Sequence, residues 1–248
     1  MDWSGIAAQL GAHLRASVAG VRPGEGWWIV VAVAAALVAV VVRPVWRWTR
    51  IAVTIVHELG HAVVGLLSGR KWQRFVVHPD MSGEVSTLGR PTGIGRVLTT
   101  AAGYPAPAVV GAVGIWAALA GWGPLVLLAL AVMALGALVR ARSAFTVLAL
   151  LVVLAGDLAA WWFGDVQLVA ALVCGVSAFL MLGAWRQLLN VARSDDPGQD
   201  PVVLAMLTRL PRGGWVAVFV LVVGAFSWWA LMMLWPVLGG WLGLFSGR

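Results

Sequence analysis

Charged residues are scarce in this chain. Seventeen Lys and Arg together with ten Asp and Glu make up 11% of the 248 residues, whereas a soluble domain carries about 25%. Hydrophobic residues account for 61% and the mean hydropathy is +0.93. Such a composition leaves too little polar surface for an ordinary soluble domain, and it indicates a polytopic membrane protein.

Cysteine is nearly absent as well. Cys174 is the only one, which excludes an intrachain disulfide and any cysteine-based zinc site. It lies in an apolar stretch, where we expect it to pack. No basic run has the length or aromatic content of a nucleic-acid patch. We therefore expect the lipid bilayer and a membrane protein substrate as partners, and no nucleic acid. Nothing in the sequence indicates the oligomeric state.

Long apolar runs make up most of the sequence. The sequence predicts an all-α polytopic membrane protein with about seven transmembrane helices, forming a single integral membrane domain over 1–248. The first run is followed at once by Arg43 and has no small-residue cleavage site, so we interpret it as a retained span. The expected spans are 27–42, 50–68, 97–119, 124–139, 144–163, 166–185 and 215–238.

Two polar stretches interrupt these runs. Residues 69–96 predict a short β-hairpin after the second span, with apolar strand residues on both sides of a Pro79-Asp80-Met81-Ser82-Gly83 turn. Residues 186–214 contain the polar loop Ser194–Pro201, which we interpret as a solvated linker in a cytoplasmic loop. The predicted catalytic core is 50–163.

Positive charge predicts an orientation. If all seven runs cross the membrane, one side holds the N-terminal segment 1–26, 69–96, 140–143 and 186–214, and with them 13 of the 17 Lys and Arg. The positive-inside rule then makes this side, and the N-terminus, cytoplasmic. The expected location is the bacterial cytoplasmic (inner) membrane.

One motif carries chemistry. His57-Glu58-Leu59-Gly60-His61 is an HExxH sequence inside the second apolar run. Residues four apart share one helix face, so both imidazoles can reach one Zn²⁺ ion, and Glu58 can take a proton from a zinc-bound water. Glu58 is the only charged residue between 51 and 67, and a carboxylate at mid-bilayer costs about 2.5–3.5 kcal/mol. The alternative is a chance match in a packing helix.

Catalytic zinc usually has three protein ligands and a water. His57 lies seven residues past Arg50, about 10 Å along the helix. Asp157 lies six residues before Phe163 in a span that runs back to the same face, about 9 Å from it. The depth match favours Asp157 as third ligand, against the alternative of a buried, hydrogen-bonded polar residue. Weaker candidates lie in predicted loops: His78, Asp80, Asp195, Asp196 and Asp200.

The segment that follows the hairpin is unusual. Ala101–Ala108 contains Tyr104 and two prolines, which free backbone groups that a membrane helix tolerates only near water or helpful neighbours. A kinked, small-residue helix here would leave a water-accessible cavity beside the metal, or it is an ordinary packing helix. Tyr104 is the chain's only tyrosine. Its alternatives are an oxyanion donor and an interfacial anchor.

Three stretches together resemble a known family. Val56–Ala62, His78–Gly83 and Ala102–Pro107 are similar to the site-2-protease class of intramembrane metalloproteases, in its compact bacterial M50B-like branch. The resemblance covers about 45–210. It implies that His57 and His61 bind zinc, that Glu58 is the general base, and that the hairpin presents an unwound substrate segment by strand addition.

The predicted function is a zinc-dependent intramembrane endopeptidase acting on membrane-embedded proteins. The family's third ligand is an Asp in an N-x-x-P-x-x-x-x-D-G motif, which this sequence lacks. That absence favours the alternative of a catalytically inactive membrane scaffold or regulator. A metal-dependent transporter is a third possibility, but a single acidic residue on each of two helices provides few of the polar groups that an ion path needs.

Overall fold

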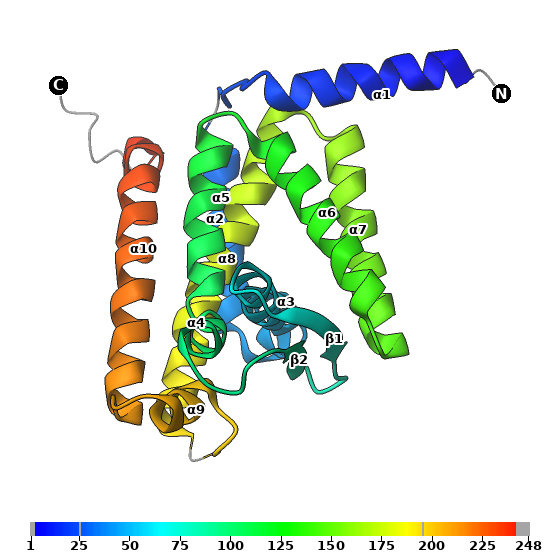
Figure 1. The fold of residues 1–248 in the computed structure, drawn as a ribbon. Helices are drawn as coiled ribbons and strands as arrows, with labels where there is room; N and C mark the ends of the chain where they lie inside the picture. Colours follow the sequence, from blue (N-terminus) through cyan, green and yellow to red (C-terminus); the bar gives the residue numbers. More distant parts are fainter. Residues whose placement is uncertain (1–2, 25, 195, 242–248) are drawn as a thin grey trace.

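The structure of this chain is a computed structural model, which describes residues 3–24, 26–194 and 196–241 (Figure 1). The described chain is mostly helical, with one two-stranded hairpin, as the sequence predicts. Its elements in order are α1 (Trp3–Val18), α2 (Trp27–Val41), α3 (Arg43–Leu67), β1 (Lys71–Val77), β2 (Gly83–Leu88), α4 (Ile94–Ala101), α5 (Ala106–Leu119), α6 (Gly123–Arg140), α7 (Ala144–Phe163), α8 (Val166–Arg193), α9 (Asp200–Leu207) and α10 (Arg212–Trp241).

Helix α8 forms the centre of the bundle, where it packs between α2 and α5. Small residues allow this close approach: a Cβ at Gly111 would lie 2.5 Å from the Ser177 carbonyl oxygen, and one at Gly175 would lie 2.9 Å from the Ala32 Cβ. Cys174 is fully buried in the same core, as expected for a packing residue. Close contact through small residues is how apolar helices associate in a membrane.

Five described helices are long and apolar enough to cross a membrane: α3, α6, α7, α8 and α10. Helices α4 and α5 make a sixth if they count as one span, but they meet at a 66° bend. Helix α2 has only 15 residues, although it is strongly apolar. Five to six candidate spans and this shorter helix account for the seven apolar runs, and the chain is an integral membrane protein.

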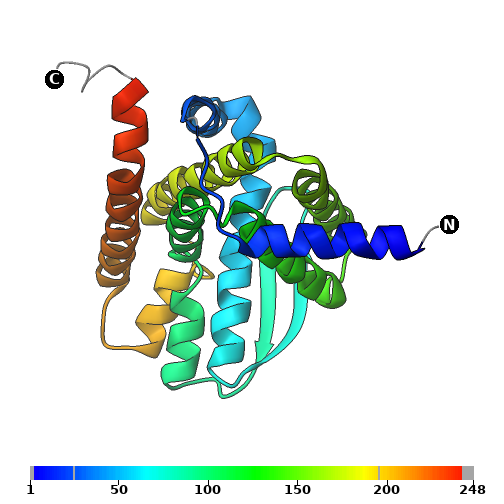
Figure 2. The same cartoon turned by 90° about the horizontal axis from the view of Figure 1, so that it is seen from above.

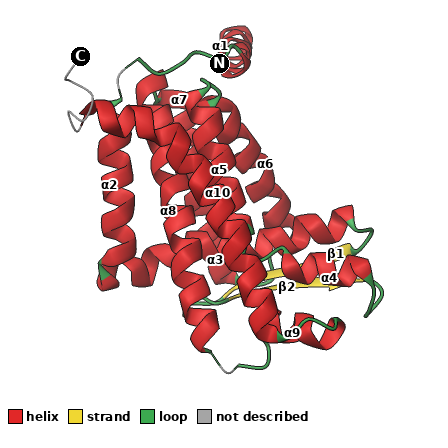
Figure 3. Cartoon of the chain, turned by 90° about the vertical axis from the view of Figure 1, so that its left-hand side faces the viewer, coloured by secondary structure: helices red, strands yellow, loops and turns green. Residues whose placement is uncertain are grey.

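The bundle has two distinct ends. At one end α5 and α7 finish, α6 and α8 begin, and α1 lies across the top (Figures 1 and 3). Helix α1 is fastened there by Trp161 Nε1, which donates to Ser17 Oγ at 2.9 Å, and by a 3.2 Å contact between His13 Nε2 and the Trp162 carbonyl oxygen. We call this the α1 end. At the opposite end, the α9 end, α2, α6 and α8 finish.

Helix α3 does not run along the bundle. It appears nearly end-on in Figure 1 and lengthwise when the molecule is viewed from above in Figure 2, so it lies crosswise to α5 and α8, towards the α9 end. The hairpin and α4 lie beside it in the same layer (Figures 2 and 3). The most polar of the apolar runs is therefore enclosed by other elements, and it buries Val53, Glu58, His61 and Ala62 among others.

The hairpin has the predicted turn. Strands β1 and β2 pair antiparallel with Phe75 opposite Val85, and Met81 occupies the left-handed backbone region at φ 65°. Thr54 Oγ1 on α3 donates to the Met81 carbonyl at 2.9 Å, which fixes the turn to the helix. The edge of β1 that faces away from β2 is occupied by the segment after α6, because the Arg142 amide donates to the Phe75 carbonyl at 3.1 Å. Strand β2 is the other edge of this sheet.

Candidate metal centre

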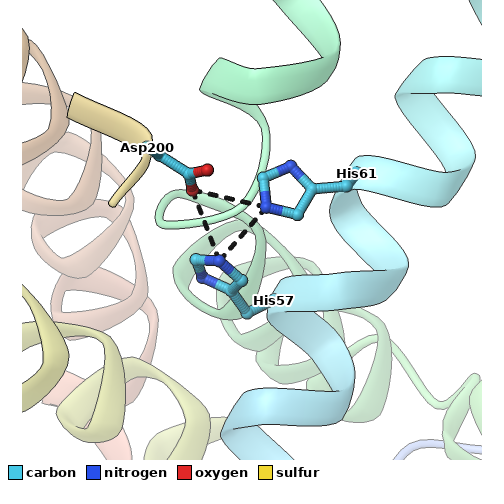
Figure 4. A group of neighbouring side chains, drawn as sticks. All are labelled: His57, His61 and Asp200. Carbon is cyan, nitrogen blue, oxygen red and sulfur yellow. Dashed lines mark hydrogen bonds and ion pairs between the residues drawn. The ribbon is translucent and has the colours of Figure 1, made fainter. Parts of the chain in front are cut away.

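The two histidines of the HExxH sequence project from consecutive turns of α3 and meet a carboxylate from α9 (Figure 4). The Nε2 atoms of His57 and His61 are 3.2 Å apart. The Asp200 Oδ2 atom lies 3.4 Å from His57 Nε2 and 3.3 Å from His61 Nε2. Within the described chain, His57, His61 and Asp200 form the group whose ligand atoms could hold a metal ion.

The spacing of these donors suits zinc. Ligands at about 2.0–2.2 Å in a tetrahedron are separated by about 3.3–3.6 Å, close to the three distances between His57, His61 and Asp200. Asp200 Oδ2 is buried and has no hydrogen-bond donor among the described residues, so this oxygen is free for a cation. Two imidazoles and one carboxylate also form a common ligand set for catalytic zinc, with the fourth position left to water.

The orientation of His61 is fixed from behind. Its Nδ1 lies 2.7 Å from the carbonyl oxygen of Thr99 on α4. Since the carbonyl can only accept, Nδ1 donates the proton of this bond, and Nε2 is the ring nitrogen that faces Asp200 and His57. This is the usual way in which a protein sets the tautomer of a metal-binding histidine. His57 Nδ1 is buried without such a partner in the described part of the chain.

The break between α4 and α5 lies directly over the histidines. A Cβ at Gly103 would stand 2.5 Å from His61 Nε2 and 2.6 Å from His57 Nε2. A Cβ at Gly60, on α3, would stand 2.5 Å from the Ala106 Cβ. Glycine at Gly103 lets the break lie against the two imidazoles, and glycine at Gly60 lets α3 lie against the start of α5. The kink expected from the two prolines is real, and it forms one wall of the site.

Glu58 is buried between α3 and the hairpin, with 8% of its surface exposed. Gly83, the first residue of β2, faces it: a Cβ there would lie 2.7 Å from the Glu58 Cγ and 3.1 Å from its Oε1. Gly83 of the hairpin therefore packs directly against the side chain of Glu58, the residue that follows His57 in the HExxH sequence.

Asp200 has the charge state that a cation needs. Burial alone would raise its pKa, but the neighbouring His61 and the contacts with both histidines outweigh this, so its pKa lies below the usual value. The carboxylate form is thereby favoured at neutral pH.

The sequence-based choice of third ligand differs from this arrangement. Asp157 does not belong to the group formed by His57 and His61. It lies about 9 Å along α7 from Phe163, near the end covered by α1, and its Oδ2 has no hydrogen-bond partner among the described residues. Asp157 and His57 would lie at equal depth only if α3 descended from the same face as α7, whereas α3 runs crosswise near the α9 end.

The loop residue Asp200 lies beside the two histidines instead. The stretch expected to be a solvated linker ends in a short helix, α9, with Asp200 at its start. A signal for this was present: Asp200-Pro201 is followed at once by the apolar run Val202–Leu207, which a solvated linker would not contain. Of the remaining loop candidates, neither His78, Asp80 nor Asp196 belongs to the group, and Asp195 lies outside the described residues.

An HExxH helix completed by a distant carboxylate inside an apolar bundle defines the site class of a membrane-embedded metallopeptidase. Comparison with family models agrees: residues 30–230 match the Peptidase M50B-like family. The match covers most of the chain, and the chain belongs to this family. No curated protein and no solved structure gives a significant match.

Proposed function

We propose that this protein is a zinc-dependent intramembrane endopeptidase whose metal is held by His57, His61 and Asp200. The observation that carries the proposal is the convergence of these three donors at 3.2–3.4 Å from one another. Membership in a peptidase family supports the same reaction class. Asp200 also supplies the ligand whose expected motif is missing from the sequence, which removes the main reason for regarding the protein as an inactive scaffold.

Each residue around the metal position has a distinct proposed role. Bound zinc would polarise the peptide carbonyl and lower the pKa of its water to about 7. Glu58 takes the proton of the attacking water and later returns it to the leaving amine. Thr99 keeps His61 in the tautomer that leaves Nε2 available. Gly103 packs against the two histidines and Gly83 packs against Glu58, and the absence of side chains at both positions allows these close approaches.

The substrate is proposed to be a membrane protein segment in extended form. Peptide bonds inside a helix are shielded by its own hydrogen bonds, so a protease acts on an unwound stretch. Strand β2 offers an edge for such a stretch, because β1 occupies its other side and the Gly83 end of β2 touches Glu58. Main-chain pairing along β2 would deliver the substrate backbone to the base without demanding a particular side-chain sequence.

The arrangement also supports an orientation in the bacterial cytoplasmic membrane. Because α3 lies crosswise, the segments 42–105, 140–143, 193–194 and 196–212 share the α9 end, and they contain 13 of the 17 basic residues. The α1 end holds Arg15 and Arg22. By the positive-inside rule we propose that the α9 end, with the metal site, faces the cytoplasm and that α1 faces the opposite side. This is the reverse of the orientation expected from seven straight spans.

Single cysteines test this orientation in intact cells, after Cys174 is replaced by alanine. Cysteine at exposed Ala8 should react with a membrane-impermeant maleimide from outside, whereas cysteine at exposed Thr92 should react only after permeabilisation. The opposite labelling pattern would restore a cytoplasmic N-terminus.

The experiment for the enzymatic proposal uses the full chain purified in detergent or lipid. We expect one zinc per chain by metal analysis, and cleavage of a transmembrane substrate that stops on removal of zinc by a chelator and returns when zinc is added. A protein that binds zinc stoichiometrically but cleaves no membrane substrate would favour the scaffold. A protein without affinity for zinc would refute the proposed site.

A further inference from the structure

We propose that Tyr104 and Gln199 are positioning residues that hold Asp200 against the two histidines. The inference rests on the proposed zinc site and concerns residues that do not touch the metal. Asp200 is the only member of the site that does not come from α3, so its place depends on whatever fixes the start of α9. Gln199 directly precedes it, and the Gln199 carbonyl accepts from the Val202 amide at 2.9 Å as the cap of that helix.

Tyr104 is tied to Gln199 by a short hydrogen bond. Its phenolic OH donates to Gln199 Oε1 at 2.6 Å, across 95 residues of sequence. The other side of the Gln199 amide is also engaged, since Nε2 donates to Asp196 Oδ2 at 3.2 Å. Both ends of this side chain are therefore fixed, and with them the residue before the ligand.

Tyr104 itself is held rigidly. Only 8% of its surface is exposed. The rings of Tyr104 and His57 meet edge to face, with their centroids 4.7 Å apart. The Tyr104 ring also stacks on that of Phe219 in α10, with centroids 5.6 Å apart. It follows Gly103, whose backbone covers both histidines. One side chain thus touches a histidine ligand directly and reaches the aspartate ligand through a single residue.

The hydrogen bond of Tyr104 favours a positioning role over that of an oxyanion donor. An oxyanion donor needs an OH directed at the reacting carbonyl, whereas the OH of Tyr104 is directed at Gln199. A side chain that connects two ligands from separate helices instead sets the distance between them. Partners that orient metal ligands from behind typically contribute about 10–100-fold to metal affinity.

The test measures zinc affinity of the full chain by competition with a chelator. Tyr104→Phe keeps the ring contacts with His57 and Phe219 and removes only the OH. We expect it to weaken zinc binding about tenfold, and Gln199→Leu to do the same. Gln199→Leu also removes the bond from Nε2 to Asp196. The double variant should be no weaker than Gln199→Leu alone, because the bond lost in Tyr104→Phe is one that Gln199→Leu already removes.

Trp185→Phe is the matched control. It removes another hydrogen bond between distant helices, the 3.0 Å bond from Trp185 Nε1 to Ser227 Oγ, and should leave zinc affinity unchanged. Equal losses in the control and in Tyr104→Phe would mean that general loosening of the bundle, and not positioning of Asp200, is responsible.

A second readout does not depend on affinity. Because the chain has one tyrosine, protein grown with 3-fluorotyrosine gives one ¹⁹F resonance. That resonance should shift when zinc is added to the wild type, and the zinc-induced shift should shrink in Gln199→Leu. Wild-type zinc affinity in Tyr104→Phe, or strictly additive losses in the double variant, would overturn the positioning role. A wild-type chain that binds no zinc would instead contradict the proposed function.

Discussion

Helices α3 and α7 are both apolar and each carries one acidic residue, but of the two only α3 contributes to the candidate metal site. Around Glu58, α3 is enclosed by the hairpin, α4 and α5, and it buries residues along most of its length. Along α7, only Thr146 and Leu150 are buried. An acidic residue in an apolar helix is therefore a stronger functional candidate when other elements surround that helix than when the helix lies at the edge of a bundle.

The comparison predicts that the histidines of α3 have the largest effect. His57→Ala combined with His61→Ala removes two of three ligands, so stoichiometric zinc should fall to background and all cleavage should cease. Metal analysis of the purified variant, with circular dichroism to show that the helices remain, checks this. Zinc retained at one per chain would place the metal elsewhere.

The base should be nearly as important for rate but not for binding. Glu58→Gln removes the proton acceptor, so the rate of cleavage should fall by about 10²–10⁴-fold while zinc content stays at the wild-type level. Single-turnover cleavage beside metal analysis separates the two quantities. A variant that cleaves normally would exclude Glu58 as the base.

Asp200 and Asp157 give the sharpest contrast between the two regions. Residues that only orient metal ligands typically contribute about 10–100-fold to metal affinity. Asp200→Ala should weaken zinc binding by more than this, and the activity should be lost as well. Asp157→Ala should leave zinc affinity and activity close to wild type. If the two variants exchange these outcomes, the depth argument is right and the α9 carboxylate is incidental.

Gly83 should have a smaller effect. In Gly83→Val the new side chain would meet Glu58 Cγ, and displacement of a catalytic group by about 1 Å can cost 10²-fold in rate. Zinc content should not change. Gly156→Ala on α7 is the control, since nothing lies within 4 Å of a Cβ there. Equal activity of both variants would show that the hairpin does not hold the base.

Local features of this protein were predictable, because short-range spacing determines them. The apolar runs, the hairpin turn over Pro79–Gly83 and the shared face of His57 and His61 each depend on residues a few positions apart. The kink near Tyr104 followed from its prolines.

The proposed third ligand, Asp200, was not predictable in this way. Its identity depends on how α3 crosses the bundle and on where the loop after α8 returns, and both are set by packing between segments far apart in sequence. Depth along a helix translates into depth in a membrane only for a helix that spans it. The apolar run after Asp200 was the one local hint, and it does not by itself specify a metal.

The contact between Gly83 and Glu58 bears on how members of this family are classified from their sequences. The proposed catalytic carboxylate, Glu58, packs against a residue without a side chain, 25 positions away on a different element. A relative with intact HExxH and aspartate ligands but a bulky residue at this turn would bind metal and still lack a correctly placed base. Assigning proteolytic activity therefore requires reading the hairpin along with the metal ligands.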